Sequence, residues 1–158
     1  MKHIILIRHA QAEVLLEGME DATRSLIEKG KKRLRKIGPF LKQMIGEYET
    51  VTIYSSELKR SIQSAQILSK RLNRTYAGEQ SFLQTGETDL LLDLIRSRDE
   101  DCLIFVGHQP YLSTFSEQLS GLDLSFETCA CACFSMVDDE FNLEWYAQPH
   151  WMMRYAKV

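Results

Sequence analysis

Basic and imidazole side chains follow three separate apolar runs in this sequence. They are Arg8 and His9 after Ile4–Ile7, Arg60 after Val51–Tyr54, and His108 after Cys102–Val106. Arginine offers a fork of donors that matches phosphate oxygens, and a neutral imidazole can attack phosphorus as a nucleophile. If the fold brings these positions together, the residue types predict phosphoryl chemistry.

The elements that must position these side chains are buried strands separated by helices. Each apolar run is short and rich in β-branched residues, as is typical of a strand covered on both faces, and helical periodicity follows over 34–45 and 62–72. Strands that alternate with helices form a parallel sheet, and ligands bind beyond the carboxyl ends of its strands. We therefore expect an α/β fold, a three-layer α/β/α sandwich with a mostly parallel central sheet. Residues 75–77 should add an edge strand, and 126–137 with 141–146 an antiparallel C-terminal hairpin.

Several boundaries can be predicted from local signals. Ser25 and Glu28 form a capping-box pattern at the start of the first helix, and Gly38-Pro39 should break or kink that helix. A later helix over 86–96 should turn Leu90 inward, and Pro110 suits the first residue of the helix after His108. The acidic, aperiodic segment 11–23 should be a surface loop that borders the site.

Length and charge limit the function classes. A chain of 158 residues predicts a single domain over 1–158, and a net charge of -3 gives no general affinity for nucleic acid or anionic membrane. No apolar run has the length of a signal-peptide core or a membrane span, so we expect a cytoplasmic protein.

Cys129, Cys131 and Cys133 alternate along the chain, which would place three sulfurs on one face of a strand. Zinc sites favour Cys-x-x-Cys spacing, so we expect these cysteines, with Cys102, to be small reduced core residues rather than metal ligands.

The run Lys29–Lys36 holds six basic residues in eight. It could be a docking patch for an acidic partner, but such a run is more often the solvated face of an amphipathic helix. It lacks the interleaved aromatic residues that would support RNA binding.

Three motifs together resemble the histidine phosphatase, or phosphoglycerate mutase-like, superfamily. They are Ile7-Arg8-His9-Ala10, the segment 53–65 with Ser55-Ser56-Glu57-Leu58-Lys59-Arg60, and Val106-Gly107-His108-Gln109-Pro110. Within that superfamily, the short chain and the segment 24–30 are most similar to SixA-type phosphohistidine phosphatases. The resemblance implies a phosphoglycerate mutase-like fold without a lid insertion.

The resemblance also implies roles for individual residues. His9 would be the nucleophile that accepts the phosphoryl group, and Arg8, Arg60 and His108 would hold its oxygens. Arg24 and Ser56 would contribute to substrate binding. These side chains supply the positive charge, so we expect neither metal nor cofactor. Attack needs one free nitrogen on His9, and the other should donate to a main-chain carbonyl.

The motifs depart from the family pattern at five positions, one of which is Ala10 in place of the commoner glycine. Glu57 replaces a proline, Ser61 an alanine, Ser64 a threonine, and Ser25 the proline after Arg24. None of these changes removes a charged group that the chemistry needs.

Three functions are compatible with these residues. The leading one is a phosphatase for phosphohistidine or another phosphorylated protein residue. The second is a phosphatase for a small phosphoester, in which Glu87 is a candidate general acid for the alkoxide leaving group. Phosphohistidine has a better leaving group, so the absence of an obvious acid motif favours the first. The third is a non-catalytic phosphate-binding module that docks acidic partners through Lys29–Lys36.

Overall fold

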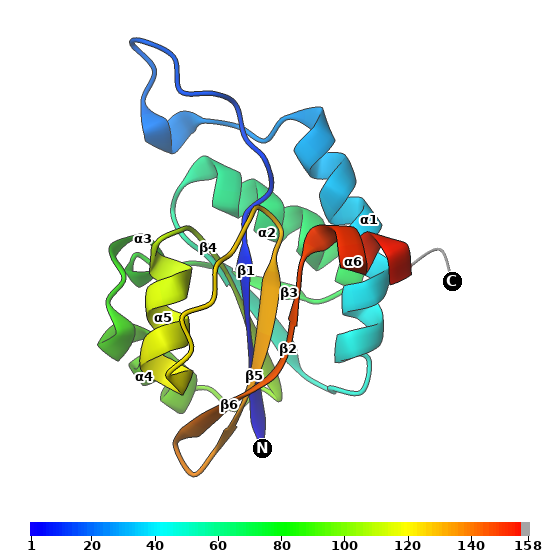
Figure 1. The fold of residues 1–158 in the computed structure, drawn as a ribbon, viewed down its shortest axis with the longest axis vertical. Coiled ribbons are helices and arrows are strands. Elements are labelled where there is room, and N and C mark those ends of the chain that lie inside the picture. Colours follow the sequence, from blue (N-terminus) through cyan, green and yellow to red (C-terminus); the bar gives the residue numbers. More distant parts are fainter. Residues whose placement is uncertain (156–158) are drawn as a thin grey trace.

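The computed structural model describes residues 1–155 and contains a six-stranded mixed sheet (Figure 1). The strand order is β3-β2-β4-β1-β5-β6. The strands are β1 (Lys2–Arg8), β2 (Val51–Ser55), β3 (Thr75–Glu79), β4 (Cys102–Gly107), β5 (Cys131–Val137) and β6 (Glu140–Ala147). The first four pair in parallel, whereas β5 is antiparallel to both β1 and β6. The expected mostly parallel sheet with an antiparallel C-terminal hairpin is confirmed.

Helices cover both faces of the sheet. They are α1 (Glu28–Ile45), α2 (Lys59–Leu72), α3 (Phe82–Thr85), α4 (Thr88–Ser97), α5 (Tyr111–Ser120) and α6 (Pro149–Tyr155), with one 3₁₀ turn, η1 (Asp21–Thr23). The buried clusters place α1, α2 and α6 on one face and α3, α4 and α5 on the other (Figure 1). This is the three-layer arrangement that the sequence predicts.

Strand β1 lies inside the sheet between β4 and β5, and its apolar run explains that position. Ile5 and Ile7 belong to the cluster under α1 and α2, while Ile4 and Leu6 belong to the opposite cluster. Successive side chains of a strand point to opposite faces, so a strand covered on both sides must be apolar at every position. The chain then leaves the sheet at Arg8 and His9.

The start of α1 differs from the prediction. Ser25 is not the N-cap, because α1 begins at Glu28 after Ile27. The Ser25 N–H instead donates to the Glu13 carboxylate (2.7 Å), next to an isolated bridge between Ala12 and Leu26. This pairing joins the two ends of the loop between His9 and α1 and leaves Ser25 no capping role.

Three further local predictions need correction. The helix α1 is not broken at Gly38-Pro39 but continues to Ile45, since its buried face, which includes Ile37 and Leu41, packs in the core on both sides of the proline. Leu90 is 43% exposed rather than buried. Pro110 is the N-cap of α5, and Tyr111 is its first helical residue.

The cysteines lie in the core as expected. All four are free, buried, and part of the cluster that α1 and α2 cover. The segment 126–130 precedes β5 rather than extending it, and Cys129 has a φ of 68°. Among residues 1–155, no helix combines the length and apolar character that crossing a membrane would require.

Candidate active site

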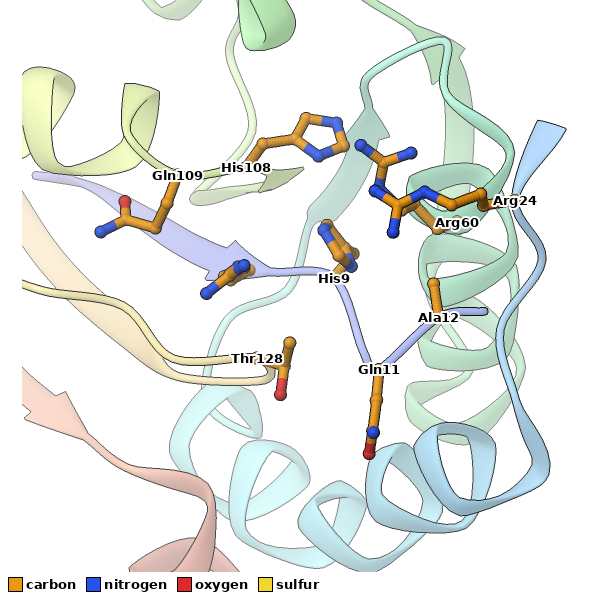
Figure 2. Close-up of a pocket in the computed structure, with 9 residues that line it drawn as sticks. His9, Gln11, Ala12, Arg24, Arg60, His108, Gln109 and Thr128 are labelled. Carbon is orange, nitrogen blue, oxygen red and sulfur yellow. The ribbon is translucent and has the colours of Figure 1, made fainter. Parts of the chain in front are cut away.

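A pocket of about 310 Å³ lies where β1, β2 and β4 end (Figure 2). The five residues predicted to surround a phosphoryl group all line it: Arg8, His9, Arg24, Arg60 and His108. Gln11, Ala12, Gln109 and Thr128 complete its wall. Parallel pairing of β1 with β4 and of β4 with β2 places the three strand ends side by side, which brings residues separated by a hundred positions into one cavity.

His9 is held in one orientation by its own backbone neighbour. Its Nδ1 lies 2.7 Å from the Ala10 carbonyl oxygen. Burial, together with the nearby charges of Arg60 and Arg8, lowers the pKa of His9 to about 4, against the opposing effect of the Ala10 hydrogen bond. At neutral pH the ring is therefore uncharged, Nδ1 carries the proton that it donates to the carbonyl, and Nε2 keeps a lone pair. This is the tautomer that nucleophilic attack requires.

His108 is the second imidazole, with its ring centroid 5.0 Å from that of His9. Its Nε2 is 2.5 Å from the Ser56 hydroxyl and 3.0 Å from the Ser61 hydroxyl. Burial, together with the nearby charges of Arg60 and Arg8, lowers the pKa of His108 to about 3. A neutral ring whose Nε2 accepts from serine carries its proton on Nδ1, and that Nδ1 is buried without a partner within the described residues.

The arginines present unused donors to the same pocket. Arg8 donates from one terminal nitrogen to the Phe126 carbonyl (3.0 Å), and Arg60 donates to the Asp21 carbonyl (3.0 Å). The Nε atoms of Arg8 and Arg60 are buried and unpartnered. Together with His108 Nδ1, they make up three of the five buried side-chain polar atoms that have no partner in residues 1–155. Unsatisfied buried donors are costly and rare, so their concentration here indicates a site for an anion.

Asp21 is a site residue that the sequence did not identify. Its carboxylate accepts from Arg60 (3.1 Å) and from Arg24 (2.8 and 3.0 Å), so it bridges the two guanidinium groups. Partial burial opposes its ionisation, but the hydrogen bonds and charges of Arg60 and Arg24 prevail and lower its pKa. The only sequence signal was the Asp21–Arg24 spacing inside an aperiodic acidic loop.

Two predicted residues lie behind or outside the pocket. Ser56 is fully buried and contacts His108 rather than lining the cavity. Glu87 precedes α4, accepts a hydrogen bond from Thr85 (2.7 Å), and is not among the residues that line the pocket. Glu57 likewise bonds outward, to Gln84 (2.6 Å).

The serines that depart from the family pattern fill positions in the site. Ser61 contacts His108 Nε2, and Ser64 accepts from the Ala10 N–H (3.0 Å) while donating to the Arg60 carbonyl (2.8 Å). Ser64 thus ties the segment after His9 to the first turn of α2, which fixes His9 relative to Arg60.

Comparison with known proteins agrees with this geometry. A model of the histidine phosphatase superfamily (branch 1) matches residues 4–84. The chain belongs to the histidine phosphatase superfamily. It is therefore a phosphatase of that superfamily. A search of curated protein sequences returns no match.

Solved structures show the same phosphoglycerate mutase-like fold. A SixA protein histidine phosphatase in complex with tungstate superposes with a TM-score of 0.80 at 20% identity, over 94% of this chain and 97% of that one. A structure from Agrobacterium tumefaciens assigned as phosphohistidine phosphatase SixA gives 0.79 at 22% identity, over 94% and 98%. A mycobacterial glucosyl-3-phosphoglycerate phosphatase in complex with VO₃ gives 0.72 at 16% identity, over 94% and 100%. The histidine phosphatases of this fold thus include protein and small-molecule phosphatases.

Proposed function

We propose that this histidine phosphatase hydrolyses phosphohistidine, or another phosphorylated residue of a protein, through a phosphorylated His9. One observation supports this most directly. A neutral His9 with a free Nε2 lies beside three unpartnered donors, on Arg8, Arg60 and His108, which match the needs of a phosphoryl group in transfer.

In the proposed reaction, Nε2 of His9 attacks phosphorus in line with the leaving nitrogen. The new Nε2–P bond forms as the substrate P–N bond breaks, and the leaving imidazole departs neutral when it has first been protonated. Water then attacks the phosphorus of phospho-His9 and releases inorganic phosphate. The Ala10 carbonyl holds the Nδ1 proton during attack, and it stabilises the ring as positive charge develops on it.

The lack of an effective acid favours an N-phosphoryl substrate. An ester leaves as an alkoxide that needs a proton, whereas Asp21, the carboxyl group bonded to the pocket arginines, has a lowered pKa and is ionised at neutral pH. The positive side chains supply the charge stabilisation that magnesium supplies in kinases, so we expect activity without added metal.

A small phosphoester is the second candidate substrate, because similar structures include the mycobacterial glucosyl-3-phosphoglycerate phosphatase. Glu87 would be its candidate acid, reached by movement of the segment before α4. Glu87→Gln separates the two proposals: a large loss of rate on an ester would favour the second, and an unchanged rate would remove Glu87 from the chemistry.

The deciding experiment compares kcat/KM on a phosphohistidine protein and on a panel of small phosphate esters, in the presence of a metal chelator. His9→Ala should abolish turnover, and His150→Ala, which alters an exposed histidine on α6, is the matched control. A marked preference for phosphohistidine that His9→Ala removes supports the proposal. A preference for one ester refutes the substrate assignment, and retained turnover in His9→Ala refutes the nucleophile.

A further inference from the structure

The two helices on one face of the sheet hold most of the positive charge of this protein. The helices α1 and α2 contain eleven of the nineteen Lys and Arg residues, but only one of the twenty-two Asp and Glu residues, Glu28. The rest of the chain is correspondingly acidic. A net charge of -3 therefore conceals a strongly basic surface on one layer of the fold.

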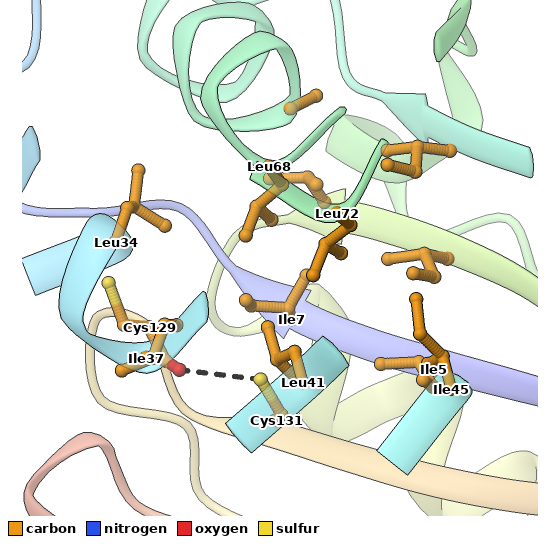
Figure 3. Close-up of a cluster of buried hydrophobic side chains, with 14 of the residues drawn as sticks. Ile5, Ile7, Leu34, Ile37, Leu41, Ile45, Leu68, Leu72, Cys129 and Cys131 are labelled. Carbon is orange, nitrogen blue, oxygen red and sulfur yellow. Dashed lines mark hydrogen bonds between the residues drawn. The ribbon is translucent and has the colours of Figure 1, made fainter. Parts of the chain in front are cut away.

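A groove runs between the outer faces of these helices. Their inner faces are apolar and pack over Ile5 and Ile7, with Leu34 and Leu41 from α1 and Leu68 from α2 in one cluster (Figure 3). On the outside, two adjoining hollows of about 400 and 300 Å³ share three lining residues, which are Arg35, Ile67 and Lys70. Arg71 completes the first hollow, and Lys31, Gln63 and Gln66 complete the second.

The cations of the groove are largely without counter-charges. Lys31 has Glu28 at 3.6 Å, but no ion pair within residues 1–155 involves Arg35, Lys70 or Arg71. These three side chains are exposed. Like charges that converge from two helices repel one another, and a bound polyanion would relieve that repulsion.

The groove begins beside the catalytic pocket. Gln63 lies one helical turn after Arg60 on α2, and its Oε1 accepts from the Leu26 N–H (2.8 Å), two residues after Arg24. From Gln63 to Arg71 the helix rises by about 12 Å, which matches roughly four residues of extended polypeptide. Because Arg60 lines the pocket and Gln63 lines the groove, about 4.5 Å apart along α2, a substrate segment a few residues from the phosphorylated one can reach the groove.

We propose that this groove binds an acidic segment of the phosphorylated protein substrate, and this inference rests on the proposed function. Gln63 and Gln66 offer amides that can bond to a peptide backbone, and Ile67 offers an apolar contact. None of the lining residues is aromatic, although single-stranded nucleic acid is usually bound by base stacking. A membrane would require a wide apolar face, whereas the groove is concave and holds a single apolar side chain.

Direct binding tests the groove separately from catalysis. The probe is a fluorescein-labelled, unphosphorylated Glu-rich peptide, measured by anisotropy against the full chain at low and physiological ionic strength. Arg35→Glu with Lys70→Glu should weaken binding about tenfold, because two attractive pairs become repulsive. Lys32→Glu with Lys36→Glu is the matched control, since it makes the same change in net charge on α1 outside the groove and should retain most of the affinity.

Folding of the variants is checked by circular dichroism, which should match the wild type in both double variants because every substituted side chain is exposed. Equal weakening in the two double variants would show an effect of net charge alone and overturn the proposal. Absence of peptide binding to the wild-type protein would also overturn it. Groove-dependent binding of an oligonucleotide or of anionic vesicles, tighter than that of the peptide, would assign another partner and refute the acidic segment.

A second arm links the groove to catalysis. Two phosphohistidine peptides are compared, one flanked by Glu and one by Gln. The Glu-flanked peptide should have the lower KM with the wild-type protein, and Arg35→Glu with Lys70→Glu should abolish that difference. If neither peptide is hydrolysed while the Glu-rich probe still binds in the groove, the proposed function fails and the groove remains a site for acidic polypeptide. If both are hydrolysed with equal KM, the proposed function stands and the groove proposal fails.

Discussion

Mild acid should destabilise this protein through its two buried histidines. The pKa of His9 is about 4 in the folded state, against an ordinary value of 6.5. Above about pH 6.5 the ring is neutral in both folded and unfolded chains, so it contributes no pH dependence there. Between these two values the unfolded chain binds a proton that the folded chain does not, so the free energy of unfolding decreases as pH falls through this window.

The size of the effect follows from the two pKa values. Proton linkage gives a loss of about 2 kcal/mol for His9 alone when pH falls from roughly 7.5 to 5. His108, with a folded pKa of about 3, acts in the same direction. Stability due to these rings is therefore fully present above their unfolded pKa and decreases as pH falls toward their folded pKa values.

Urea unfolding at the two pH values, in buffer without phosphate, measures this loss. His9→Gln removes the titrating ring and should lose about 2 kcal/mol less than the wild type on acidification. Gln11→Ala alters another residue of the pocket wall and keeps both rings, so it should follow the wild type. Equal losses in the wild type and His9→Gln would refute the burial argument, and with it the neutral state of His9.

Three further predictions concern the pocket. Arg60→Ala should lower kcat/KM by about 10²–10³, the usual loss for a preorganised donor, and an undiminished value would remove Arg60 from the site. Asp21→Asn should tighten inhibition by tungstate about two- to fivefold, because the anion no longer competes with a half-exposed carboxylate for Arg24 and Arg60. Weaker inhibition would instead show that Asp21 positions these arginines. Ser56→Ala should lower kcat up to about tenfold by releasing the ring of His108, whereas an unchanged kcat would show that the hydroxyl does not fix its tautomer.

The buried strands of the sheet could be predicted from the sequence more accurately than the course of the first helix. An apolar run such as Ile4–Ile7 indicates a buried strand by itself, and three such runs separated by helices determine which residues meet at the sheet edge. The prediction for Ser25 failed because its N–H is bonded to Glu13, a contact that depends on how the loop folds back. The predicted break at Pro39 does not occur, because burial of the flanking apolar residues outweighs the cost of about 3 kcal/mol for proline inside a helix.

Within the site, charged groups at strand ends could be predicted and their partners could not. Asp21 lies in a loop without periodicity, and only the closed loop brings it to Arg60, 39 positions away. The contact of Ser56 with His108 could not be predicted for a similar reason, since His108 follows a different strand.

The buried cysteines can be used to measure local opening of the protein. All four thiols lie in the cluster under α1 and α2, and burial raises their pKa values, so the reactive thiolate is scarce in the closed state. A thiol-directed reagent would then react at a rate set by how often and how long each segment opens to solvent. The Cys129 N–H bonds to the carbonyls of Arg8 and His9, whereas Cys102 begins the distant end of β4. The ratio of the Cys129 and Cys102 labelling rates would show whether the strand ends that form the pocket open more readily than the opposite end of the sheet.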